Sequence, residues 1–184
     1  TLRNVEDTDA IIAACADATT AVVVGGGFIG IELAENLVHR GLQVTLVEAT
    51  PQVMAPIDPE LAAVVHDRLR DNGVDLRLGQ SVAAIGADDV TLADGTRVAA
   101  DVVVAAIGVR PDTSLAVGAG LAVGERGGIR VDDQFRTSDP DIYAIGDAVE
   151  KVDAIDDSAS LVPLAQTANL QGRRVADILM GRPA

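Results

Sequence analysis

The chain has 184 residues, enough to bury a substantial core, and 48% of them are hydrophobic although only 2% are aromatic. Its formal net charge of −14 argues against nucleic acid or an anionic membrane as a partner, because both require positive surface. No apolar run reaches the length of a membrane span, and a single cysteine excludes an internal disulfide, so we expect a cytoplasmic protein.

A short helix is expected first, over Asp9–Asp17, with Asp7 or Thr8 as its cap. It carries the only cysteine, Cys15, on its apolar side. We interpret Cys15 as a small buried hydrophobic residue and not as a redox group.

The most informative stretch comes next. An apolar run, Ala21–Val24, indicates a buried strand, and three glycines then lead into a helix pattern over Phe28–Arg40. A second apolar run, Leu42–Val47, ends at a single acidic residue, Glu48. The spacing of strand, glycine turn, helix and acid is typical of a dinucleotide-binding unit.

Each part of this pattern has a physical role. Gly25 permits a tight turn, Gly27 lets the backbone approach a pyrophosphate, and Gly30 lets the helix lie against the strand. The helix N-terminus offers free N–H groups to the phosphates. Glu48 is placed to accept both hydroxyls of the adenine ribose, and no Arg or Lys follows it closely, which favours NAD over NADP. A glycine turn that only packs a helix, and a solvated acid at a strand end, remain the alternatives.

A second helix is predicted to begin at Asp58-Pro59-Glu60 and to end at Asn72-Gly73. Its apolar face should consist of Leu61, Val64, Val65 and Leu69. His39 and His66 are interpreted as surface residues of the two helices, too isolated to hold a metal. The strand Val74–Leu78 follows. Three short strands then suggest an antiparallel meander, over Val82–Ile85, Val90–Leu92 and Arg97–Ala99.

The apolar run Asp101–Ile107 predicts a strand buried on both faces of a parallel sheet. We therefore expect an α/β fold: a Rossmann-like domain over residues 1–110, with a parallel sheet and an antiparallel meander insertion. Residues 111–184 should form a second unit. Its expected elements are strands at Ile129–Val131 and Ile142–Ile145, a loop over Ala148–Leu161, and a helix from Pro163 to about Met180.

Four stretches together resemble the pyridine nucleotide-disulfide oxidoreductases, flavoproteins that bind two dinucleotides. They are the NADH fingerprint Val23–Glu32, the joining motif Val104–Pro111, the second FAD motif Thr137–Asp147, and the helix segment Pro163–Arg173. The last of these is most similar to the branch of coenzyme A-disulfide reductase, NADH oxidase and NADH peroxidase. The resemblance implies that residues 111–184 are a partial FAD-binding segment.

The resemblance also implies residue roles. Phe28 would cover the nicotinamide pocket, Glu32 would point toward the flavin, and Gly108 would leave room for the nicotinamide. Asp147 would accept hydroxyls of the flavin ribityl chain, and the helix near Ala165 would direct its dipole at the flavin ring. The full cofactor-binding set expected is Gly25, Gly26, Gly27, Phe28, Ile29, Gly30, Glu32, Glu48, Gly108, Gly146, Asp147, Leu164 and Ala165.

The FAD fingerprint and the working cysteine of this family do not occur in the sequence. We therefore expect a middle piece of a longer protein, with the redox cysteine upstream and no catalytic residue here. Such a piece should bind NADH, lack flavin and be inactive alone; its partners would be FAD, the missing N-terminal FAD domain and a second copy in a homodimer. The longer protein would pass hydride from NADH to flavin and on to a disulfide, polysulfide, peroxide or oxygen. A ferredoxin or rubredoxin reductase and a non-catalytic NAD-binding module are the alternatives.

Overall fold

The structure is a computed structural model that describes residues 1–183, and it divides into two compact units, Thr1–Gly108 and Val109–Ala184. The division falls close to the boundary expected at residue 110. The first unit contains α1 (Val5–Ala14), β1 (Thr20–Val24), α2 (Phe28–His39), β2 (Gln43–Glu48), α3 (Pro59–Asp71), β3 (Asp75–Leu78), β4 (Val82–Ile85), β5 (Asp89–Leu92), β6 (Arg97–Ala99) and β7 (Val102–Ala105).

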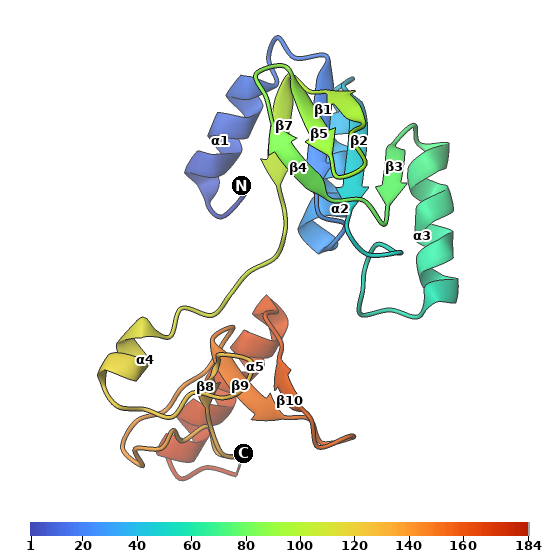
Figure 1. Ribbon diagram of the computed structural model, residues 1–184. Helices are drawn as coiled ribbons and strands as arrows, with labels where there is room; N and C mark the ends of the chain where they lie inside the picture. Colours follow the sequence, from blue (N-terminus) through green and yellow to red (C-terminus); the bar gives the residue numbers. More distant parts are fainter. Residues whose placement is uncertain (184) are drawn as a thin grey trace. The chain divides into compact units, whose positions relative to one another are not determined.

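A parallel sheet in the order β3-β2-β1-β7 forms the centre of the first unit (Figure 1). In this sheet Val23 pairs with Leu46 on one side and with Val104 on the other. The helices α2 and α3 make the crossovers from β1 to β2 and from β2 to β3. The meander β4-β5-β6 stands where a further crossover helix would be expected, as the turn signals predicted.

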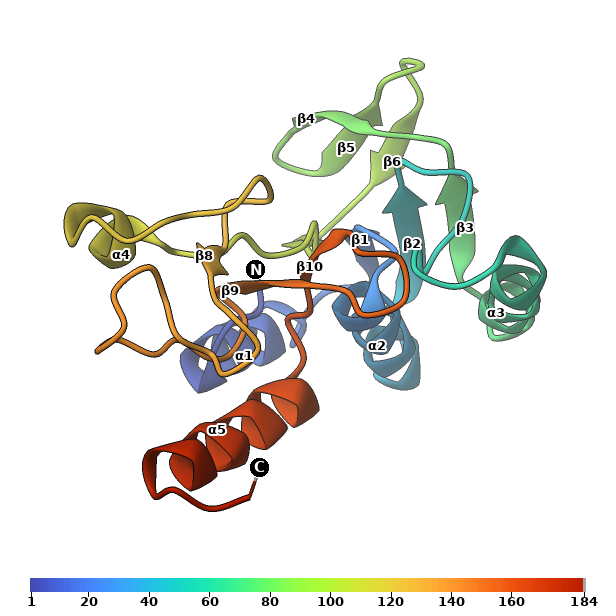
Figure 2. The ribbon, with the colours of Figure 1, turned by 90° about the horizontal axis from the view of Figure 1, so that it is seen from below.

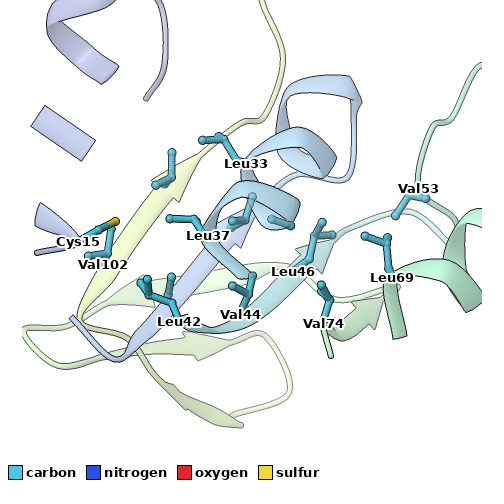
Figure 3. Close-up of a cluster of buried hydrophobic side chains, with 14 residues drawn as sticks. Cys15, Leu33, Leu37, Leu42, Val44, Leu46, Val53, Leu69, Val74 and Val102 are labelled. Atoms are coloured by element: carbon cyan, nitrogen blue, oxygen red, sulfur yellow. The ribbon is translucent and has the colours of Figure 1, made fainter. Parts of the chain in front are cut away.

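The central strand is buried on both faces, because its side chains alternate between two cores. Ala21 and Val23 belong to the cluster shared with the helices, which is drawn in Figure 3. Val22 packs instead into a cluster with Val90 and Leu92 of the meander. Figure 2 shows the consequence, with α2 on one side of the sheet and the meander on the other.

The topology fixes where a ligand can bind. In the sheet, β1 lies between β2 and β7, so the chain leaves β1 in one direction and returns beside it from the other. Ligands of open α/β sheets bind beyond the carboxyl ends of the strands at such a switch point. The glycine turn after β1, Glu48 at the end of β2 and Ala106 after β7 all lie at this edge.

The first helix begins earlier than the sequence analysis predicts. Asn4 is its N-cap, and the Asp7 amide donates to Asn4 Oδ1 over 2.8 Å. Asp7 is instead engaged in an ion pair with Arg3, and Thr8 lies inside the helix. The prediction of Asp7 or Thr8 as cap was therefore wrong, because an earlier amide side chain satisfies the same backbone group.

The inward face of α3 also differs from the prediction. Leu61 and Val64 are exposed, by 59% and 67%, whereas Ala62 and Leu69 are buried. The inward positions are Ala62, Val65, His66 and Leu69, which have the spacing of one helix face. His66 is consequently half-buried, so its interpretation as a surface residue was wrong, while His39 is exposed as expected.

The second unit contains α4 (Ser114–Gly118), β8 (Ile129–Arg130), β9 (Val149–Val152), β10 (Ala159–Leu161) and α5 (Ala165–Leu179). Its sheet has the order β10-β9-β8. Two predictions fail here. The segment Ile142–Ile145 is not a strand but makes one bridge, Arg136 to Tyr143, because no further neighbour extends it into a ladder. The expected loop over Ala148–Leu161 instead contains the antiparallel pair β9 and β10.

No helix within residues 1–183 has the length and apolar character that a membrane crossing requires. The same residues contain no group of His, Cys, Asp and Glu side chains arranged for a metal ion.

Candidate nucleotide-binding site

A hollow of about 690 Å³ opens at the carboxyl ends of β1, β2 and β7. It brings together the glycine turn, the end of β2, the loop after β2 and the segment after β7. The residues that line it include Gly25, Gly26, Gly27, Phe28, Glu48, Ala49, Gln52, Met54, Ala55, Pro56, Gln80, Ser81, Ile107 and Gly108. Its position is the switch point at which the fold places a ligand.

Three consecutive glycines form the floor of this hollow, and each meets a different constraint. Gly25 has φ of +107°, and a side chain there would overlap the carbonyl oxygen of Ala106. A Cβ on Gly26 would lie 2.8 Å from Cγ1 of Val53. A Cβ on Gly27 would meet nothing within 4 Å, so the backbone there faces open space. Protein atoms thus occupy the space beside Gly25 and Gly26, whereas the space beside Gly27 is open to a ligand.

Gly30 lets α2 begin directly against the turn. A Cβ at this position would overlap the carbonyl oxygen of Gly25 and lie 3.6 Å from Cβ of Ala106. The close approach is therefore to the glycine turn and to the end of β7. Gly27 is the N-cap of α2, and no side chain within residues 1–183 caps its amides. These amides are available to an anion at the edge of the hollow.

Glu48 lies at the end of β2 with its carboxylate against the glycine turn. The Gly26 amide donates to Oε2 over 2.6 Å, and the Thr50 amide donates to Oε1 over 2.8 Å. Burial raises the pKa of Glu48, but the backbone hydrogen bonds from Thr50 and Gly26 outweigh burial and hold the pKa below its usual value. The hollow therefore carries a fixed negative charge at neutral pH.

The Thr50 hydroxyl determines how many acceptor positions on Glu48 are free. Its oxygen lies 2.8 Å from Glu48 Oε1 and 2.7 Å from the carbonyl oxygen of Gln52. A hydroxyl has one proton, so it donates to only one of these acceptors at a time. When it donates to Gln52, each carboxylate oxygen of Glu48 keeps one backbone donor and one free lone pair. Two adjacent hydroxyl groups of a ligand can then be accepted, one by each oxygen.

The loop after β2 forms one wall of the hollow and is tied to the turn. The Met54 amide donates to the Gly26 carbonyl oxygen over 2.9 Å. Val53 is completely buried, and its amide donates to His66 Nε2 over 3.1 Å. Burial lowers the pKa of His66; the positive charge of Arg70 lowers it further, and Asp67 opposes both. His66 therefore acts as a neutral acceptor behind the wall.

The structure does not gather every expected residue of the first unit into one place. Phe28 and Gly108 line the hollow, and Phe28 is 59% exposed at the start of α2. Ile29 is next to the hollow in sequence but does not line it. Glu32 instead lines a separate groove between α1 and α2, together with Cys15. Cys15 is buried, as interpreted from the sequence.

The expected residues of the second unit form their own small arrangement. The Gly146 amide donates to the side-chain oxygen of Gln171 over 2.7 Å, which ties the turn after residue 145 to α5. Asp147 is exposed in this turn, and Leu164 and Ala165 are exposed at the start of α5. Their expected role toward flavin stays a prediction.

Sequence reasoning missed three side chains that organise these segments. His66 and Gln171 each bond a backbone amide far along the chain, and no local pattern signals such a bond. Glu150 is 6% exposed, and its carboxylate accepts from the amides of Arg126 and Gly128. The helical spacing of His66 with its buried neighbours could have placed it on the inward face of α3, but not its bond to Val53.

Comparison with known proteins gives a consistent result. Residues 1–172 match the family model described as pyridine nucleotide-disulphide oxidoreductase. The chain is 40% identical to the ferredoxin reductase subunit of 5,5'-dehydrodivanillate O-demethylase from Sphingobium, over all of this chain and 46% of the relative. It is 33% identical to coenzyme A disulfide reductase from Staphylococcus haemolyticus, over 98% of this chain and 42% of the relative. The chain thus spans less than half the length of these curated relatives.

Solved structures extend the match to three dimensions. Reduced CoADR-RHD from Bacillus anthracis has 49% identity and a TM-score of 0.93, over 98% of this chain and 33% of that chain. The water-forming NADH oxidase of Lactobacillus brevis, bound to NADH, has 32% identity and a TM-score of 0.88, over 99% of this chain and 41% of that chain. An engineered NADPH-bound mutant of that oxidase has 31% identity with the same TM-score.

These matches confirm the expected α/β fold class and agree with NAD(H) and FAD as the cofactors. The match covers nearly the whole chain, from its first residue to the middle of α5. The chain belongs to the pyridine nucleotide-disulphide oxidoreductase family.

Proposed function

We propose that this chain is the NADH-binding part, with a segment of the FAD-binding part, of an FAD-dependent oxidoreductase. Residues 1–110 would hold NADH, and residues 111–184 would contribute to the flavin site. In the whole protein the nicotinamide supplies a hydride that the bound flavin accepts. The contribution of this chain is to bind the nucleotide and to orient it.

The observation that carries this proposal is the meeting of Glu48 with the glycine turn inside one hollow. A diphosphate fits the open side of the turn at Gly27, where amides at the start of α2 are free. The adenine ribose fits beside Glu48, whose two oxygens can accept its two hydroxyls once Thr50 donates to Gln52. The site therefore offers suitable partners to two adjacent groups of a dinucleotide, the diphosphate and the adenine ribose.

The nicotinamide would lie toward Phe28 and Gly108. Phe28 presents an exposed ring at the rim of the hollow, in contrast to the buried core position that an aromatic at a helix start can also take. Gly108 has φ of +94° and open space where a side chain would be, so a flat ring can approach its backbone.

The charge of Glu48 supports a preference for NADH over NADPH, because a 2′-phosphate would meet a carboxylate that is ionised at neutral pH. The engineered NADPH-bound oxidase points the same way. In that mutant a glycine is replaced by alanine, and an aspartate further along the chain is also replaced by alanine. The residue after that aspartate is replaced by arginine. Gly30 and Glu48 are separated by the same number of positions as that glycine and aspartate.

The electron acceptor of the whole protein is proposed to be a disulfide, polysulfide, peroxide or oxygen. The similarity to coenzyme A disulfide reductase and to NADH oxidase supports this class. Cys15 is buried outside the hollow, so a working cysteine would have to come from outside this chain. A second candidate is electron delivery to a ferredoxin, favoured by the 40% identity to the Sphingobium ferredoxin reductase subunit.

Titration of the purified protein with NADH and with NADPH tests the proposal. We expect NADH to bind with a dissociation constant at least about tenfold lower than that of NADPH, which corresponds to about 1.4 kcal/mol. Equal affinity for the two nucleotides would contradict the role of Glu48, and no binding of either would contradict the site itself.

We further propose a cytoplasmic location and a homodimer for the protein. A single cysteine, with no disulfide, suits a reducing compartment. Ile142 and Ile145 are 38% and 43% exposed, and β8 lies at an edge of its sheet, which supports association with a second copy. A monomer in sedimentation at high concentration would count against the dimer.

A further inference from the structure

His66 does not line the hollow, but its side chain is hydrogen-bonded to the loop after β2, which forms one wall of the hollow. The Val53 amide donates to His66 Nε2 over 3.1 Å, and Val53 packs directly against Gly26. We propose that His66 is a positioning residue for the adenosine half of the nucleotide, and that tight binding requires its neutral form. This inference rests on the proposed function.

The hydrogen bond fixes the protonation state that the wall requires. A neutral imidazole has one nitrogen that donates and one that accepts, so acceptance at Nε2 places the proton on Nδ1. Protonation makes both nitrogens donors. His66 Nε2–H would then face the Val53 N–H, and a buried amide would lose its acceptor next to a positive charge.

The effect reaches the nucleotide through two residues of the wall. Val53 has no exposed surface, so it cannot move without disturbing Gly26 beneath it. Met54 follows with φ of +53°, a conformation uncommon outside glycine, and its amide holds the Gly26 carbonyl. The Gly26 amide in turn holds Glu48. Loss of the His66 bond therefore loosens the turn that faces the diphosphate and the carboxylate that faces the ribose.

Burial, together with the positive charge of Arg70, keeps His66 neutral at neutral pH. Burial lowers its pKa, Arg70 on the same helix lowers it further, and Asp67 raises it. The facing wall, Val53 to Ile57, carries no ionisable side chain, and the nearest ionisable residues before and after it in the sequence are Glu48 and Asp58. Because the folded protein depresses the pKa, the stabilisation is present at neutral pH and is lost as the pH falls through that pKa.

Calorimetric titration with ADP-ribose, which carries the adenosine and the diphosphate but no nicotinamide, tests this inference. We expect the dissociation constant of the wild type to rise about five- to tenfold when the pH is lowered from about 7.5 to about 5. A change of this size corresponds to the loss of one buried hydrogen bond. His66→Gln supplies an amide oxygen that accepts without titrating, so its affinity should stay nearly constant over this range. His39→Gln is the matched control, because His39 is exposed on α2, and it should keep the wild-type dependence.

His66→Leu removes the acceptor at every pH, so its affinity at pH 7.5 should already be about fivefold lower and should not fall further. Saturating ADP-ribose should lower the pKa of His66 measured by NMR, because coupling between the two sites is reciprocal. A wild-type pH dependence retained in His66→Gln, or a His66 pKa unmoved by ADP-ribose, would overturn the role of His66 alone. Absence of binding by the wild type at pH 7.5 would overturn the nucleotide site and the role of His66 together.

Discussion

Replacing Glu48 by glutamine isolates the contribution of its negative charge, because the side chain keeps its length. In the wild type one carboxylate oxygen accepts from the Gly26 amide and the other from the Thr50 amide. A glutamine has a single carbonyl oxygen, and its NH₂ group must face one of these two donors. One backbone N–H at the edge of the hollow then loses its acceptor.

The expected cost follows from that geometry. An unpaired buried donor costs about 1–3 kcal/mol, and a value of about 2 kcal/mol corresponds to a roughly 30-fold easier local opening. Gly26 is buried whereas Thr50 is exposed, so the cost is largest when the amide left unpaired is that of Gly26. Affinity for NADH should fall at least about tenfold as well, since the variant also loses one acceptor for the ribose hydroxyls.

Two measurements check this prediction. Amide hydrogen exchange followed by NMR reports opening at Gly26 and Thr50 directly, and fluorescence titration reports the affinity for NADH. Glu35→Gln is the matched control, since Glu35 is exposed on α2 outside the hollow, and both readouts should remain at wild-type values. Unchanged exchange at both amides together with unchanged NADH affinity in Glu48→Gln would refute the reasoning.

The charge of Glu48 also makes a prediction about acid. Its pKa is held below the usual value in the folded protein, so ionised Glu48 stabilises the fold at neutral pH. This contribution is lost as the pH falls through the lowered pKa. The protection of the Gly26 amide against exchange should therefore decrease on acidification in the wild type and should depend less on pH in Glu48→Gln.

Further predictions concern the turn and the second unit. Gly25→Ala should destabilise the first unit by about 1–3 kcal/mol, because its φ is positive and a Cβ would overlap Ala106, and thermal unfolding would show this. Gly27→Ala should change stability by less than about 0.5 kcal/mol, since a Cβ there meets open space, yet weaken NADH binding at least about tenfold; normal affinity would contradict the placement of the diphosphate. Glu150→Ala should cost about 2 kcal/mol in chemical denaturation by leaving two amides unpaired, whereas Glu150→Gln, which keeps an acceptor oxygen, should cost less.

Much of the first unit is predictable because local signals and the fold agree there. The apolar run before Gly25 predicted a buried strand, and the structure divides its side chains between two cores. The turn residues between β4, β5 and β6 predicted the meander correctly. Glu48 was placed at the turn by spacing alone, since a strand of that length ends at the edge where the glycines lie.

The failures arise where the deciding partner is distant in sequence. The inward face of α3 depends on how the helix is rotated against the sheet. That rotation turns Ala62 and His66 inward and leaves the apolar Leu61 and Val64 exposed. Strand formation depends on a neighbouring strand with which to pair. The apolar segment Ile142–Ile145 makes only a bridge, whereas the more polar β9 pairs with both β8 and β10. Bonds such as that of His66 to the Val53 amide leave no local pattern at all.

A crystal structure of the protein with bound NADH tests the central claim most directly. We expect the diphosphate against the amides that follow Gly27, and the two hydroxyls of the adenine ribose within hydrogen-bond distance of Glu48, with the Thr50 hydroxyl turned to Gln52. Nucleotide bound in the groove between α1 and α2, or a ribose held away from Glu48, would contradict the account.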